Sequence, residues 1–103
     1  MSGSVTPLDG PNRPGVPAAE TRLRALGVEP HAWSNGPGDR YAAHEHGFTK
    51  LLVCAEGSIT FLVGDAGEPV ELVAGRGFVL PAGMRHAAVV GTDGCTCLEG
   101  HRG

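Results

Sequence analysis

The residues with the clearest capacity for chemistry are histidines, of which the chain has five. His44 and His46 lie two apart in an apolar segment, and alternate side chains of a strand point to the same face. Two such imidazoles can offer two nitrogen ligands to a divalent metal, and His86, in a later apolar segment, is the candidate for a third. A three-histidine face would leave positions open for water or substrate. Packing of the pair in a core or at the surface stays open as the alternative.

These side chains need strands to bring them together. The chain has 17 glycines and 8 prolines but few aromatic residues, which is typical of many turns between short strands. After Gly27, short apolar runs alternate with turn residues, which predicts eight strands near 30–34, 40–46, 50–55, 58–63, 69–73, 77–80, 85–90 and 95–99. This spacing indicates an all-β fold, an antiparallel barrel or sandwich.

One short helix is expected before the strands. Ala19, Leu23 and Leu26 share one face, with Pro17 near the start and Gly27 after the end, which predicts a helix over 18–26. Residues 1–15 are rich in proline and lack a periodic apolar pattern. We expect a flexible arm there, or an edge segment that orders only against a neighbour, followed by one domain over 16–103.

Size and charge exclude several classes of partner. With 103 residues and a formal net charge of −3, the chain is one globular domain whose few basic residues are scattered. We therefore expect no nucleic-acid partner and no anionic membrane surface. No apolar run approaches the roughly 18 residues of a membrane span, and the first residues lack the features of a signal peptide, so a cytoplasmic location is expected.

Cysteines and aromatic residues supply further candidates. An odd, small number of cysteines predicts reduced thiols. Cys54 is expected to face the interior, as a small hydrophobe or as a ligand-binding residue, whereas Cys95 and Cys97 are expected to pack in the core. Trp33 and Tyr41 are expected to close the barrel mouth or fill the core, and at the mouth they would also contact a ligand.

Two segments of this chain resemble the motifs of the cupin superfamily. In GDRYAAHEHGFTKLLVCAEG the matching residues of the first motif are Gly38, His44, His46 and Gly57, and in GRGFVLPAGMRHAAVV those of the second motif are Gly75, Pro81, Gly83 and His86. The resemblance covers about residues 30–100. It implies a double-stranded β-helix, or jelly-roll barrel, and a homodimer. It also implies that the three histidines converge to hold Fe, Mn, Ni, Zn or Cu.

One departure from the cupin pattern concerns the metal site directly. Lys50 stands where the family places a metal-binding glutamate, and Val90 where it often has asparagine. Lys50 keeps the parity of the two histidines and is expected to face inward. It could anchor an anionic ligand, act as a general acid or base, or form a Schiff base. The structural alternative is an ion pair with a carboxylate such as Glu56 or Glu99.

Three functions follow as hypotheses. The first is a barrel in which His44, His46 and His86 hold a divalent metal and Lys50 orients a small anionic organic ligand, as a binding protein or as an enzyme of oxygen-dependent cleavage or isomerisation. The second is a metal-free ligand-binding or sensory barrel, favoured by Lys50 and Val90. The third is a self-associating structural unit that exchanges its N-terminal arm between subunits.

Overall fold

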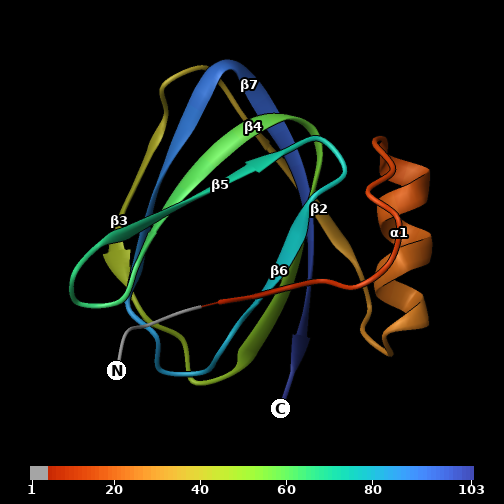
Figure 1. Cartoon of the computed structure of the whole chain (residues 1–103), viewed down its shortest axis with the longest axis horizontal. Helices are drawn as coiled ribbons and strands as arrows, with labels where there is room; N and C mark the ends of the chain where they lie inside the picture. Colours follow the sequence, from red (N-terminus) through yellow and green to blue (C-terminus); the bar gives the residue numbers. More distant parts are fainter. Residues whose placement is uncertain (1–4) are drawn as a thin grey trace.

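The computed structural model describes residues 5–103, which form an antiparallel barrel with one helix on its outside (Figure 1). The elements are β1 (Thr6–Pro7), α1 (Val16–Ala25), β2 (His31–Asn35), β3 (Arg40–His44), β4 (Thr49–Val63), β5 (Glu68–Val73), β6 (Gly77–Leu80) and β7 (His86–Arg102). This arrangement confirms the predicted all-β antiparallel barrel with one short helix near the N-terminus.

Two long strands, β4 and β7, form the spine of the barrel. They pair antiparallel along almost their whole length, from Thr49 opposite Arg102 to Val63 opposite His86. At one end β6 flanks β4 and β2 flanks β7, and at the other end β5 flanks β4 and β3 flanks β7. The two half-sheets therefore share the same pair of strands and face each other across the interior.

Each long strand replaces two of the predicted short ones. Turns were expected at residues 56–57 and 91–94. The β4–β7 ladder runs through the first with a shift in register; at the second, residues 91–94 bulge out of the pairing between Cys95 and Val90 while β7 continues. Gly57 and Gly94 have positive φ angles of 72° and 76°, which lets the strands bend sharply without ending. A side chain at Gly57 would overlap the carbonyl oxygen of Gly94, so the bend also needs glycine for space.

Several residues of the segment 5–15, which was expected as part of an arm, contact the barrel. Thr6 and Pro7 pair with β6, which is the edge-segment alternative, and Leu8 is buried. The Arg22 guanidinium donates to the carbonyl oxygens of Leu8 at 2.7 Å and Gly75 at 2.8 Å, joining this segment to α1 and the barrel. Residues 1–4 of the predicted arm lie outside the described residues. A domain boundary at residue 16 stays a prediction.

The helix begins two residues earlier than expected, with Pro17 in its first turn. Ala19 and Leu23 are buried as predicted, but Leu26 is 37% exposed. Because α1 ends at Ala25, Leu26 no longer follows the helical face on which it was expected. Across residues 5–103 no helix combines the length and the apolar character needed to cross a membrane.

Buried side chains form two clusters on opposite faces of β4. The first fills the barrel interior and includes Leu52, Cys54 and Phe61. The second lies under α1 and includes Leu51, Val53 and Leu23. Alternate residues of 50–55 therefore face different clusters, which confirms the predicted inward face of Leu52 and Cys54. The segment is apolar on both sides because both of its faces are buried.

Candidate metal and ligand site

Three histidines converge inside the barrel from separate segments. His44 ends β3 and is the register partner of His86, which begins β7. His46 lies two residues beyond the end of β3, because the strand is shorter than the predicted 40–46. The ring centroids are 4.3 Å apart for His44 and His86, 4.7 Å for His44 and His46, and 5.1 Å for His46 and His86. One nitrogen from each ring lies within 4.8 Å of the other two.

Backbone carbonyl groups orient two of these rings. The Nδ1 atom of His44 hydrogen-bonds to the carbonyl oxygen of Ala42 at 2.7 Å, and that of His86 to the carbonyl oxygen of Met84 at 3.0 Å. Because a carbonyl oxygen only accepts, each Nδ1 carries the proton and each Nε2 presents a lone pair. This is the tautomer needed for coordination through Nε2.

Two ring nitrogens of the triad are buried without a hydrogen-bond partner in the described part of the chain, Nδ1 of His46 and Nε2 of His86. Burial lowers the pKa of His46, and the nearby charge of Lys50 lowers it further. Burial also lowers the pKa of His86, against the opposite effect of its bond to Met84. Neutral imidazoles with free buried nitrogens are the donors that a divalent transition metal takes, so the triad fits such an ion.

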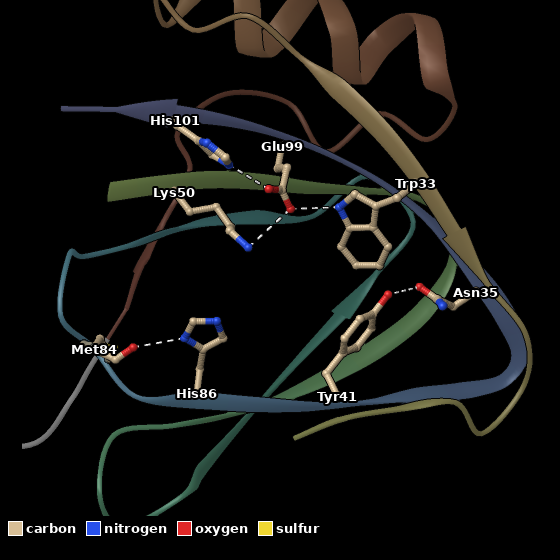
Figure 2. A network of polar contacts seen from close by, with 8 residues as sticks. All are labelled: Trp33, Asn35, Tyr41, Lys50, Met84, His86, Glu99 and His101. Carbon is tan, nitrogen blue, oxygen red and sulfur yellow. Dashed lines mark hydrogen bonds and ion pairs between the residues drawn. The ribbon is translucent and has the colours of Figure 1, made fainter. Parts of the chain in front are cut away.

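Lys50 is held by a carboxylate from the neighbouring strand. Its Nζ lies 3.3 Å from Oε1 of Glu99, and both side chains are less than one fifth exposed. The same oxygen accepts a hydrogen bond from Nε1 of Trp33 at 2.8 Å, while Oε2 lies 2.7 Å from Nε2 of His101 (Figure 2). Glu99 is therefore contacted by three side chains at once.

The charge state of Glu99 follows from these contacts. Burial alone would raise the pKa of its carboxyl group, but the hydrogen bond from His101 and the positive charge of Lys50 outweigh burial and lower it. Glu99 is thus ionised at neutral pH, and the Lys50–Glu99 pair contributes no net charge to the interior.

A cavity of about 210 Å³ lies beside the triad. It is lined by side chains from the four strands β2, β3, β4 and β7, which are Trp33, Tyr41, His44, Lys50, Phe61, His86, Ala88 and Glu99. Figure 2 shows Lys50 and His86 pointing into the same space from opposite sides, with Trp33 and Tyr41 along another wall. The arrangement joins a metal-binding face, a cation and an aromatic wall around one small volume.

Most residues expected from the sequence meet at this cavity. Trp33 and Tyr41 line it, and the hydroxyl of Tyr41 donates to the side-chain oxygen of Asn35. Lys50 faces inward as predicted and pairs with Glu99 rather than Glu56, which is exposed. Cys54 is not among the lining residues; its side chain is wholly buried in the interior cluster.

Sequence reasoning named Glu99 as a possible ion-pair partner of Lys50, but missed it as a wall of the cavity, although a signal was available. Cys95, Cys97 and Glu99 alternate along one strand, so the inward face expected for the cysteines extends to the carboxylate. Phe61 also lines the cavity and was missed, because an apolar residue of a strand core carries no distinguishing signal.

Solved structures with the same fold are numerous. One chain from the crystal structures of the DMSP lyases RdDddP and RnDddQII matches with a TM-score of 0.67 and 29% identity, over 74% of this chain and 38% of that one. An RmlC-like cupin from Shewanella frigidimarina NCIMB 400 matches at 0.63 and 22%, over 72% and 64%. KdgF from Halomonas sp. matches at 0.61 and 22%, over 74% and 70%.

These matches confirm the cupin resemblance and the double-stranded β-helix. The chain spans well under half the length of the lyase chain and 64% of the Shewanella cupin. The search of curated proteins finds no match. The family model described as the AraC-like ligand binding domain matches residues 26–98. This range includes the three histidines, Lys50 and the whole of β2. The chain therefore belongs to the family of AraC-like ligand-binding domains, with a cupin fold.

Proposed function

We propose that this domain binds a divalent transition metal through His44, His46 and His86, and a small anionic organic molecule in the adjacent cavity. The observation that carries the proposal is the convergence of three imidazole nitrogens within 4.8 Å of one another. Two of the rings are held by carbonyl groups, and two buried nitrogens lack another partner among the described residues.

Charge favours an anionic ligand. An imidazole that binds a metal is neutral, and the paired Lys50 and Glu99 contribute no net charge. A bound divalent cation would therefore leave the interior with an uncompensated charge of about +2. A carboxylate or similar anion would offset this charge. The cavity of about 210 Å³ is smaller than the ~300–1,000 Å³ of pockets for drug-sized ligands, which favours a compact molecule.

Lys50 would orient that ligand. Its ammonium group lies on the cavity wall and has hydrogen atoms to donate beyond the one directed to Glu99. Paired in this way, it suits anchoring an anion or giving a proton as a general acid. It suits Schiff-base formation less, because an ammonium group has no lone pair for attack on a carbonyl.

Catalysis would add to this binding role. When bound, a divalent metal supplies a Lewis acid or an oxygen-binding centre, which suits isomerisation or oxygen-dependent cleavage of the ligand. Lys50 would hold the ligand against the imidazole face, while Trp33, Tyr41 and Phe61 would exclude water. The lyases among the solved neighbours support the view that this fold accommodates turnover of small molecules.

Elemental analysis of protein purified without a polyhistidine tag tests the metal site. We expect about one transition-metal ion per chain in the wild type and almost none in His46→Ala. His31→Ala is the matched control, because His31 is exposed at the start of β2 and is expected to leave the metal content unchanged. Full metal content in His46→Ala, or no metal in the wild type after loading, would contradict the proposal.

A second candidate is binding of the same kind of ligand without metal. The observation that favours it is the position of Lys50. In addition to burial, its positive charge lowers the pKa of His46 and His86, and the same charge would repel a metal ion bound between these rings. Calorimetric titration with small carboxylic acids, with and without a chelator, separates the two candidates. Affinity that the chelator leaves unchanged would favour the metal-free barrel, and affinity that it abolishes would favour the metal site.

A further inference from the structure

Three thiols gather in the interior where β4 and β7 bend. Cys54 on β4 and Cys97 on β7 are direct register partners, and both are completely buried. Cys95 lies two residues before Cys97, belongs to the same interior cluster, and is opposite Gly57. All three are free cysteines, and none of them lines the cavity beside the histidines.

Backbone hydrogen bonds define the geometry of the Cys54–Cys97 pair. The N–H of Cys54 donates to the carbonyl oxygen of Arg76 at 2.9 Å, and its carbonyl accepts from the N–H of Gly75 at 2.7 Å. Both groups therefore point away from β7, which makes Cys54 and Cys97 a non-hydrogen-bonded pair of the antiparallel ladder. In such pairs the Cα atoms are about 4.5 Å apart and the side chains are closest.

That separation lies within the range of roughly 4.4–6.8 Å that a disulfide spans. Cys95 and Cys97, two apart on one extended strand, have Cα atoms about 6.6 Å apart, close to the upper limit. The cross-strand pair is therefore the better placed of the two. A hollow of about 240 Å³ is lined by Cys95 together with Gly94 and Glu56, and it reaches the edge of the cluster at Cys95 but not Cys54 or Cys97.

We propose that Cys54 and Cys97 form a reversible redox pair, which a peroxide converts into a cross-strand disulfide. The Cys54 sulfur attacks one peroxide oxygen, the O–O bond breaks, and one water leaves after protonation. The Cys97 sulfur then displaces the hydroxyl group of the resulting sulfenic acid, and a second water leaves. Two thiols lose two hydrogen atoms in total, and hydrogen peroxide is reduced to two waters.

Two features support this order of events. The sulfur of Cys54 donates to the carbonyl oxygen of Glu56 at 3.3 Å, a residue that lines the hollow. The contact with Cys97 lowers the pKa of the Cys54 thiol and raises the pKa of Cys97. Cys54 is therefore the better nucleophile and Cys97 the resolving thiol. Cys95 would remain a free thiol beside the new bond.

Peptide mapping of the full-length protein after treatment with hydrogen peroxide tests the proposal. Cleavage after Lys and Arg places Cys54 in the peptide 51–76, and both other cysteines in the peptide 86–102. We expect a mass loss of two hydrogens, a link between these two peptides, one remaining free thiol, and reversal by dithiothreitol. Because the bond closes a loop of about 40 residues, Tm should rise by about 15 °C or more.

Matched variants identify the two sulfurs. Cys95→Ser should still form the link, whereas Cys97→Ser should lose it. His46→Ala should form it as the wild type does, which separates the redox pair from the metal site. The proposal would be overturned if all three thiols stayed reduced in the folded wild type, if the bond lay within 86–102, or if Cys97→Ser kept the link.

Discussion

The two faces of β4 are both buried, but they are buried against different surroundings. Residues 51, 53 and 55 face outward and pack under α1 in a buried apolar cluster that includes Leu23 and Leu98. Residues 50, 52 and 54 face the barrel interior, where Lys50 borders the cavity while Leu52 and Cys54 pack in the core. The outer face contributes stability alone, whereas the inner face combines stability with a polar site, and mutations should separate these roles.

The largest effect on stability is expected on the outer face. Leu23 of α1 is fully buried over β4, and Leu23→Ala removes three carbon atoms of the side chain and leaves a cavity. Chemical denaturation should show a loss of about 2–5 kcal/mol in the free energy of unfolding. Metal content per folded molecule should stay unchanged. Loss of metal from the folded fraction would show that the two faces are not independent.

On the inner face, Lys50→Met should strengthen metal binding. The substitution removes a positive charge that acts on His46 and His86. At an effective dielectric near 20, a unit charge repels a divalent ion by about 1.5–3 kcal/mol over separations of roughly 10–20 Å, so metal affinity should rise at least about tenfold. Competition with a chromophoric chelator measures the change. Lys50→Arg keeps the charge and is the control; equal gains in both variants would contradict an electrostatic origin.

Glu99→Gln should change the acid end of the stability profile. The pKa of Glu99 is lowered in the folded protein, so its contribution is present above the unfolded value near 4.5 and is lost as pH falls through the folded pKa. Denaturation midpoints between pH 3 and 7 should therefore fall less steeply in Glu99→Gln than in the wild type. Parallel profiles for the two proteins would show that Glu99 is not stabilised as an anion.

The smallest effect is expected at the surface. Glu29 lies 3.4 Å from Arg24, but both side chains are more than half exposed. Glu29→Gln should change the free energy of unfolding by less than about 0.5 kcal/mol, because solvent screens such pairs. It serves as the charge-matched control for Glu99→Gln, and a change as large as that of Glu99→Gln would remove the distinction between interior and surface carboxylates.

Much of the site could be predicted because strand parity and motif spacing are local signals. They identified His44, His46 and His86 and the inward direction of Lys50. The sequence named Glu56 and Glu99 as possible partners of Lys50, but the choice between them was harder, because Glu99 is close only through the pairing of β4 with β7. Alternation with Cys97 was the one local sign that Glu99 faces inward.

The errors in the fold have physical reasons of the same kind. Glycine is typical of turns, yet Gly57 and Gly94 allow the two long strands to bend and continue. The segment around Thr6 has no strand pattern, because its pairing with β6 is decided by an exposed edge elsewhere in the chain. Local sequence indicates where the backbone can bend, while distant strands decide whether the ladder continues.

The most direct test of the central claim is a titration of metal-free wild-type protein with Co²⁺, followed by visible absorption. The account predicts ligand-field bands that saturate at about one equivalent per chain. In His86→Ala the bands should be absent or need at least tenfold more metal, and in His31→Ala they should match the wild type. Saturable binding that survives His86→Ala, or none in the wild type, would contradict a metal site built from these three histidines.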